Sequence, residues 1–192
     1  MALPPRNLGR RYGMTAAIIS SSCRIRLPDF FRAGSHSIVD DFCYFSTKVE
    51  IGSGSHIASG CSVAGGPERI FRMGDFSSLS SGVKIWCSSN DFVSDVVAIV
   101  PEAAEPLDVR PISGDVTLEH YTGVGANSVI MPDNVVPVGT TIGAMSFVPP
   151  GFSFEPWSVY AGIPVRRVAN RDKERVLKQV TLLRRRLGLG EG

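Results

Sequence analysis

An aliphatic side chain returns at every sixth position along one continuous stretch of this 192-residue chain. The series is Ile112, Leu118, Val124, Ile130, Val136, Ile142 and Val148. An α-helix presents its apolar face about every 3.6 residues and a strand every second residue, so neither fits a period of six. A solenoid does fit, because a short strand plus a turn makes one six-residue unit and three units close a triangular coil. The sixth side chains of successive coils are then expected to stack into a shared core.

The same period continues toward the N-terminus. Its members there are Val39, Phe45, Ile51, Ile57 and Val63, then Met73, Leu79 and Ile85, while Leu27 and Ala33 extend the first group weakly. The step from Val63 to Met73 is ten residues. We therefore predict a four-residue insertion around Gly65-Gly66-Pro67-Glu68 that bulges from a corner of the coil.

A longer interruption separates Ile85 from Ile112 and contains Pro101, Pro106 and Pro111. This composition favours a protruding loop over about residues 86–111 rather than further coils. Long loops on rigid scaffolds often carry function.

Beyond the repeat, Pro149-Pro150-Gly151 ends the coils, and a loop through Trp157 leads to a predicted helix over Asp172–Leu187. Apolar residues at helical spacing, which would share one face, are Val176, Val180, Leu183 and Leu187. We expect this helix to cap the open end of the solenoid or to pack on a neighbour. The chain is thus divided into an N-terminal segment (1–26), a β-helix (27–150) and a C-terminal loop and helix (151–192).

The composition bounds the class of protein. A net charge of +2 gives no reason to propose nucleic acid as a partner. The cysteines, Cys23, Cys43, Cys61 and Cys87, lack the spacing of a metal site or a disulfide framework, which favours reduced thiols in a cytoplasmic protein and no metal. The apolar run Met14–Ile19 is too short for a signal peptide, and no run reaches the length of a transmembrane helix.

The C-terminal repeats resemble a known family. The segments Val124–Pro132, Ile142–Val148 and Tyr160–Val168 are similar to the C-terminal signature of the hexapeptide-repeat acyltransferases. The resemblance implies an all-β solenoid, the left-handed parallel β-helix, assembled as a homotrimer that binds acyl-coenzyme A between subunits. Three further motifs make the chain most similar to sugar O- and N-acetyltransferases of surface-polysaccharide biosynthesis: Val83-Lys84-Ile85-Trp86, Ser88-Ser89-Asn90-Asp91-Phe92 and Glu155-Pro156-Trp157-Ser158-Val159-Tyr160-Ala161-Gly162.

Acetyl-CoA is the expected co-substrate. The pairs Gly125-Ala126 and Gly143-Ala144 would expose backbone to an extended pantetheine arm, although small residues also serve coil stacking. The resemblance favours the cofactor role for both pairs. Arg166 and Arg167 follow Gly-x-Pro, where the family carries basic residues, and guanidinium groups suit the phosphates of coenzyme A. Arg171 is a further candidate for binding these phosphates.

Three histidines are candidates for the base that takes the proton of the acceptor. His56 immediately precedes the core position Ile57, so its side chain is expected to point outward from the same strand. His36 and His120 lie nearer the corners, where a surface histidine has no particular role. A neutral imidazole at His56 can accept a proton from an attacking sugar group.

Many members of the family carry a catalytic histidine in the loop after the middle coils, where this chain has Asn90 and Asp91. These two residues can position the acceptor, or Asp91 can take its proton; an Asx turn that starts the loop is the alternative. An amine acceptor can also react without a protein base. Trp86, Phe92 and Trp157 are candidates for an apolar wall against the substrate, or for loop packing.

These observations favour a cytoplasmic acetyltransferase. It would move an acetyl group from acetyl-CoA to a hydroxyl or amino group of a hexose or nucleotide-linked deoxyamino sugar. The alternative is a non-catalytic trimeric β-helix that serves as a scaffold or binding protein, since a fold alone does not determine function.

Overall fold

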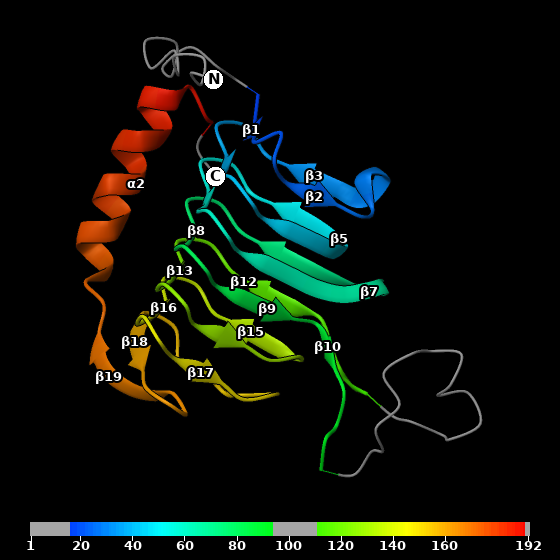
Figure 1. The fold of residues 1–192 in the computed structure, drawn as a ribbon. Coiled ribbons are helices and arrows are strands. Elements are labelled where there is room, and N and C mark those ends of the chain that lie inside the picture. The colour runs from blue at the N-terminus through cyan, green and yellow to red at the C-terminus, as the bar shows by residue number, and fades with distance from the viewer. Residues whose placement is uncertain (1–15, 94–110, 191–192) are drawn as a thin grey trace, which may run out of the picture.

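The computed structural model describes residues 16–93 and 111–190 and shows a β-solenoid of about 6 turns with a helix along its flank (Figure 1). Short strands stack in parallel from coil to coil, as the period of six predicts. The coil is the left-handed β-helix of the acyltransferases that the sequence resembles. In the described part of the chain, no helix is both long and apolar enough to span a membrane.

The first sheet forms one face of the coil and contains eight strands. In spatial order they are β1 (Ile18–Ile19), β4 (Ile38–Val39), β6 (His56–Ile57), β8 (Ser78–Leu79), β13 (Gly123–Val124), β16 (Thr141–Ile142), β18 (Ser158–Ala161) and β19 (Arg166–Asn170). Every pair is parallel except β18 with β19. Because β1 already pairs with β4, the stacked strands begin N-terminal to the boundary predicted at residue 27.

The second sheet covers the other faces. Its strands are β2 (Arg24–Ile25), β3 (Phe31–Ala33), β5 (Tyr44–Ile51), β7 (Ser62–Met73), β9 (Lys84–Trp86), β12 (Val116–Leu118), β14 (Val129–Ile130), β15 (Asn134–Val136) and β17 (Phe147–Val148), with a 3-10 turn at Pro28–Phe30. The long strand β7 pairs with β9 through its first part and with β12 through its last. It therefore bends around a corner and contributes to two faces.

The predicted ladder of aliphatic residues forms the core from Val39 to Val148. Ile112 is the exception: it lies half-buried in β11 (Ile112–Ser113), antiparallel to β10 (Ser88–Ser89), at the base of the predicted loop. The coil resumes at Val116, which pairs with Phe71. The spacing of six between Ile112 and Leu118 therefore does not reflect the repeat. Most of the predicted loop, residues 94–110, lies outside the described residues.

The four-residue insertion is confirmed by the pairing of β5 with β7. Phe45 and Lys48, three positions apart, pair with Val63 and Ile70, which are seven apart. The insertion thus lies within β7, and the buried Thr47 faces it from β5.

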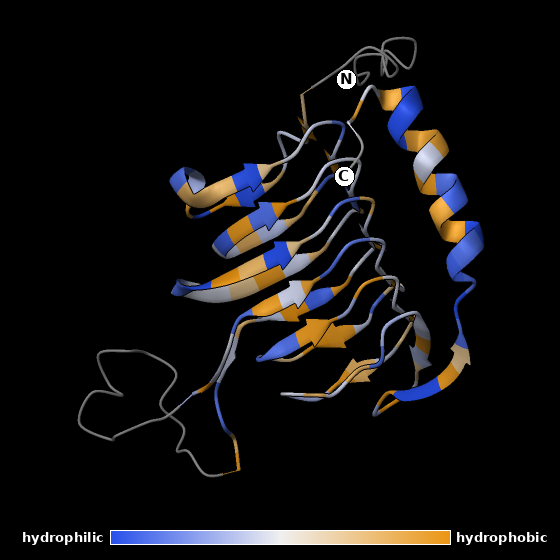
Figure 2. Ribbon diagram, turned by 180° about the vertical axis from the view of Figure 1, so that it is seen from behind, coloured by the Kyte–Doolittle hydropathy of each residue, from blue (hydrophilic) through white to orange (hydrophobic). Residues whose placement is uncertain are grey.

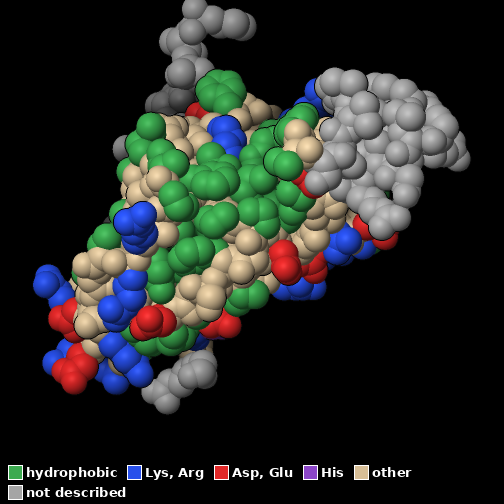
Figure 3. Space-filling view, turned by 90° about the horizontal axis from the view of Figure 1, so that it is seen from below, with side chains coloured by type: hydrophobic (Ala, Val, Ile, Leu, Met, Phe, Trp, Pro, Cys, Tyr) green, Lys and Arg blue, Asp and Glu red, His purple; other side chains and the backbone are tan. Residues whose placement is uncertain are grey.

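The C-terminal end of the stack is apolar. Figure 3 views this end, where hydrophobic side chains gather. Phe152 and Phe154 pack against the core and meet Tyr160 edge-on, with ring centroids 5.8 and 4.8 Å from its ring. These rings cover the last coil, so the end is closed by the loop that follows the repeat.

The helix α2 (Lys173–Leu187) begins as predicted, because the Asp172 carboxylate accepts the Arg175 N–H at 2.9 Å. Its place differs from the first of the two predicted, the open end of the solenoid. It runs along the flank of the solenoid, past the corners of several coils, and does not cap the open end (Figure 1). Polar residues interrupt the apolar ones along the helix (Figure 2), and Val180 is its buried residue while Leu183 stays 43% exposed.

The helix packs on a ladder of corner residues with positive φ. Phe76, Tyr121 and Trp157 occupy these corners, with ring centroids 6.4 Å apart at each step. Two other corners carry glycines that leave room for these rings: a Cβ at Gly54 would lie 2.7 Å from the Phe76 ring, and one at Gly139 would lie 2.5 Å from Trp157 Cδ2. Positive φ is costly for bulky residues, so packing of the rings on one another and on α2 offsets this strain.

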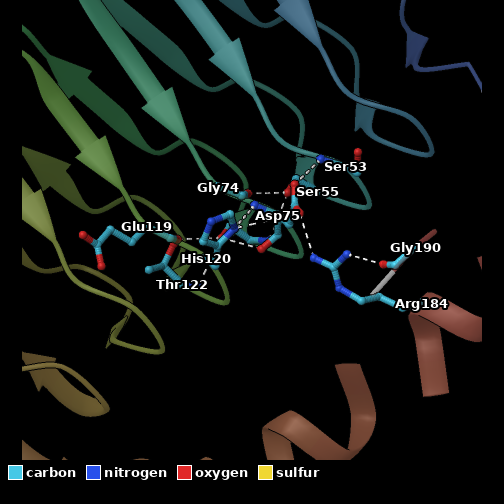
Figure 4. A network of polar contacts seen from close by, with 10 residues as sticks. Ser53, Ser55, Gly74, Asp75, Glu119, His120, Thr122, Arg184 and Gly190 are labelled. Carbon is cyan, nitrogen blue, oxygen red and sulfur yellow. Dashed lines mark hydrogen bonds and ion pairs between the residues drawn. The ribbon is translucent and has the colours of Figure 1, made fainter. Parts of the chain in front are cut away.

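Arg184 ties the helix to the solenoid. Its guanidinium lies 5.4 Å from the centroid of the Phe76 ring and donates to Asp75 Oδ2 at 3.0 Å. Asp75 Oδ1 in turn accepts the Ser53 N–H at 2.8 Å (Figure 4). The Arg184 and Asp75 side chains are 19% and 24% exposed, so the pair is partly shielded from water.

Candidate active site

His56 points outward from β6, as predicted, and has a carboxylate partner that the sequence analysis missed. Its Nε2 lies 2.9 Å from Asp40 Oδ2, a residue that follows β4 in the preceding coil. A carboxylate can only accept, so Nε2–H donates and the Nδ1 lone pair is left to receive a proton. Both side chains are partly exposed, 47% for His56 and 38% for Asp40. His56 is thus an oriented imidazole at the surface with Nδ1 unoccupied among the described contacts.

The other two histidines are placed differently. His36 lies in a corner with φ 60°. The Nδ1 atom of His120 accepts the Asp75 N–H at 2.9 Å (Figure 4). In the neutral ring this leaves the proton on Nε2 and no free lone pair, so His120 is not a base in this conformation.

A row of small residues runs along the outer surface of the first sheet. From β6 to β18, the position after the core residue of each strand holds a small residue: Ala58, Ser80, Gly125, Gly143 and Ala161; Arg166 pairs with the last of them. Arg166 lies in β19, five strands from β6 in the sheet order. Neighbouring strands are about 4.8 Å apart, so His56 and Arg166 stand at the two ends of a surface roughly 24 Å long.

Packing explains one of the predicted glycine positions. A Cβ at Gly125 would lie 2.6 Å from Ala144 Cα, so the coils can stack there only on a glycine. A Cβ at Gly143 would meet Ala161 Cβ at 3.0 Å. Gly123, in contrast, would bring its Cβ no closer than 3.4 Å to Thr141, an ordinary contact. Coil stacking therefore requires Gly125 but leaves Gly123 unexplained.

The C-terminal arginines have different surroundings. Arg166 is exposed and has no partner among the contacts of the described residues. Arg167 Nε donates to Ser158 Oγ at 3.0 Å and lies 3.4 Å from Glu155 Oε2. Arg171 donates to the Tyr121 and Gly139 carbonyls, and burial lowers the pKa of its guanidinium. Arg166 is therefore the arginine available to an anion.

A hollow lies at the base of the predicted loop. It has a volume of about 360 Å³. Three of the residues that line it, Trp86, Asn90 and Phe92, were predicted as site residues. The other two, Ser88 and Ser89, were given no role from the sequence. Phe92 is 78% exposed and Trp86 37% exposed, so both present apolar surface to solvent. Apolar walls with a few polar groups are typical of small-ligand sites.

Asp91 is not part of that lining. Its Oδ1 accepts the Val93 N–H at 3.0 Å, which is the Asx turn considered as the alternative role. Asn90 does line the hollow. His56 lies in the first sheet, whereas these residues follow β10, which pairs with β11. No contact of the described residues joins the two places within one chain.

In residues 16–93 and 111–190, no group of three or more His, Cys, Asp or Glu side chains is placed to hold a metal ion. Trp157, considered as part of a substrate wall, belongs to the corner ladder beneath α2, with Lys173 Nζ 5.5 Å from its ring centroid.

Comparison with known proteins finds similar enzymes. A variant of the N-acyltransferase AntD from Bacillus cereus, in complex with dTDP-4-amino-4,6-dideoxyglucose and coenzyme A, superposes with a TM-score of 0.79 at 31% identity, over 88% of both chains. AntD with dTDP and 3-hydroxybutyryl-CoA gives a TM-score of 0.77 at 31% identity, over 88% of this chain and 87% of AntD.

The sequence is also 28% identical to the dTDP-4-amino-4,6-dideoxy-D-glucose acyltransferase of Escherichia coli over 149 residues. This alignment covers 76% of this chain and 74% of that enzyme. A hexapeptide-repeat-containing acetyltransferase of Vibrio cholerae shares the fold, with a TM-score of 0.57 at 14% identity over 74% of this chain and 73% of that one. No family model matches the chain.

Proposed function

The chain belongs to the hexapeptide-repeat acyltransferases, and from this premise we propose that it transfers an acyl group from acyl-CoA to the amino group of a nucleotide-linked deoxyamino sugar. Two similar enzymes support this acceptor. The B. cereus variant is bound to dTDP-4-amino-4,6-dideoxyglucose, and the E. coli enzyme is named as the acyltransferase of that sugar nucleotide. The hydroxyl acceptor considered from sequence is the less favoured alternative.

The observation that carries the proposal is the row of small residues between His56 and Arg166. The pantetheine arm of acyl-CoA is long and unbranched, and a surface without bulky side chains roughly 24 Å long accommodates such an arm. Its amide groups can approach the outer surface at Gly123 and Gly125. Arg166, which has no other partner among the described contacts, binds a phosphate of coenzyme A. The thioester then lies toward His56.

The reaction is a direct transfer. The amine nitrogen attacks the thioester carbonyl, a C–N bond forms and the C–S bond breaks. His56 Nδ1 receives the amine proton, and the departing thiolate is protonated to give coenzyme A. Asp40, 2.9 Å away, holds the imidazole in the required tautomer. Asn90, Trp86 and Phe92 hold the sugar nucleotide.

This arrangement uses two subunits. His56 and the loop-base hollow lie on different faces of one chain, so a homotrimer that places the first sheet of one subunit beside the loop of the next completes the site. The enzyme acts in the cytoplasm, where acyl-CoA is present, in the biosynthesis of a surface polysaccharide. The acyl group is acetyl or a short hydroxyacyl group such as that of the 3-hydroxybutyryl-CoA bound to AntD.

The test is a thiol-release assay with acetyl-CoA and 3-hydroxybutyryl-CoA against dTDP-4-amino-4,6-dideoxyglucose and a panel of related sugars, with mass spectrometry of the product. A product heavier by one acyl unit and linked through nitrogen supports the proposal. Absence of product together with no thermal stabilisation by coenzyme A would favour the non-catalytic scaffold.

The role of His56 has its own control. His56→Ala should lower kcat by about 10² or more, as expected for loss of a general base. His36→Ala, at a corner, should leave kcat unchanged. An unaltered kcat in His56→Ala would remove His56 from the mechanism and leave an amine that reacts without a protein base, or with Asp91 as its base.

A further inference from the structure

The hairpin that carries the loop-base hollow is small. It consists of β10 and β11, with Ser88 paired to Ser113 and Ser89 to Ile112. An isolated two-stranded hairpin is at best marginally stable in water. The orientation of the hollow must therefore depend on contacts from the hairpin to the rest of the protein.

One side chain of the insertion in β7 makes such a contact. Arg69 Nε donates to Ser113 Oγ at 2.8 Å, across 44 positions of the sequence. Ser113 Oγ lies 3.5 Å from the Cys87 carbonyl, and Gly114 N donates to the same carbonyl at 3.0 Å. Arg69 is thus bonded to the strand that faces Ser88 and Ser89, which line the hollow.

The backbone around Arg69 is held on both sides. The Thr47 hydroxyl, 2% exposed, lies 2.6 Å from the Arg69 carbonyl and 3.0 Å from that of Gly66. Ile70 N donates to Asp115 Oδ1 at 3.2 Å. Gly65 packs so closely that a Cβ there would lie 2.5 Å from Cys87 Cβ. The insertion is therefore a firm support beside the hairpin.

We propose that Arg69 is a positioning residue for the acceptor, which fixes the β10–β11 hairpin and so sets the wall of the hollow formed by Trp86 and Asn90. The proposal rests on the function proposed above. It assigns a purpose to the four-residue insertion: the extra residues bring a guanidinium to the base of the loop. Arg69 acts through Ser113 and touches no reacting group.

The variants are Arg69→Ala, Ser113→Ala and the double variant, with Arg32→Ala as the matched control. Arg32 is an exposed arginine whose Nη1 donates to the adjacent Phe31 carbonyl. Arg69→Ala should raise KM for the amino sugar about tenfold, the effect of losing one hydrogen bond to a charged donor. KM for acyl-CoA should stay unchanged. Ser113→Ala should have the same effect, and the double variant no more than either.

A second measurement needs no substrate. In a Trp157→Phe background the tryptophan fluorescence comes from Trp86 alone, and its quenching by acrylamide reports the solvent exposure of Trp86. Arg69→Ala should change its quenching constant, whereas Arg32→Ala should not. Ser113→Ala provides the same test should Arg69→Ala fail to fold.

The outcomes separate the two proposals. Absence of turnover in the unmodified enzyme counts against the proposed function. Altered quenching in Arg69→Ala would still show that Arg69 fixes the β10–β11 hairpin. Unchanged quenching with unchanged KM overturns the positioning role. An equal rise of KM for both substrates, or a lower melting temperature with unchanged KM, also overturns it, because either indicates a general structural role.

Discussion

Gly125→Ala is expected to destabilise the protein strongly, whereas Gly123→Ala, two positions earlier in the same coil, is not. The methyl group at residue 125 would lie 2.6 Å from Ala144 Cα, within the backbone of the next coil. That coil cannot move away, because backbone hydrogen bonds hold it on both sides. The Gly125 N–H donates to the Ile142 carbonyl at 2.8 Å, and the Gly143 N–H donates to the Tyr160 carbonyl at 2.7 Å. At residue 123 the nearest atom is 3.4 Å away.

The magnitude follows from these contacts. Overpacking against a fixed backbone costs about 1–3 kcal/mol, and the close approach to Ala144 places Gly125→Ala at the upper end. Gly→Ala at an unstrained position stabilises by about 0.4–1 kcal/mol, through the unfolded chain. In a chain of this length 1 kcal/mol shifts Tm by about 2–4 °C. We expect Tm to fall by roughly 6–12 °C in Gly125→Ala and to change by at most about 4 °C, upward, in Gly123→Ala.

The assay is thermal unfolding followed by circular dichroism, at one protein concentration because assembly also affects Tm. Equal melting temperatures for the two variants would refute the argument that coil stacking selects glycine at residue 125. The Gly123→Ala protein serves a further purpose: its methyl group faces the proposed path of the pantetheine arm, so KM for acyl-CoA should rise without loss of stability.

Three further predictions concern charge and burial. Arg166→Ala should raise KM for acyl-CoA about tenfold, with Arg167→Ala as the paired control that changes it less; equal effects would contradict the assignment. Burial raises the pKa of the Cys87 thiol from 9.0 to about 12, so the folded state retains a proton that the unfolded state releases. That stabilisation is full below pH 9 and declines above it, so between pH 8 and 10 the wild-type free energy of unfolding in urea should fall by about 1 kcal/mol more than that of Cys87→Ala. Arg184→Ala should lower Tm and increase tryptic cleavage in α2, because the helix loses its link to Asp75; an unchanged cleavage rate would show that the link is dispensable.

Much of the coil could be predicted because its signal is local. The side chain that enters the core recurs every six residues, and the break of ten before Met73 locates the insertion. The position of α2 could not be predicted. It depends on the rings of Phe76, Tyr121 and Trp157, which lie 45 and 36 positions apart and become neighbours only after the coils have closed.

In the candidate site, too, local features could be predicted from the sequence, whereas contacts between distant residues could not. The outward direction of His56 follows from its neighbour in sequence, Ile57, and is confirmed. Asp40 was missed because its approach depends on the pairing of Ile38 with His56, a register between coils. Arg69 lies outside the repeat altogether, and nothing in its neighbours indicates Ser113 as its partner.

The corner ladder beneath α2 makes the coils non-interchangeable. Gly54 leaves room for the ring of Phe76, and Gly139 leaves room for Trp157. Deleting the coil that carries Gly139 would push the Trp157 ring against the Tyr121 ring, and duplicating it would leave a gap between them, even though the aliphatic core would still match. A solenoid that looks modular is thus fixed in length by its corners, and relatives should gain or lose residues in the loops rather than by whole repeats.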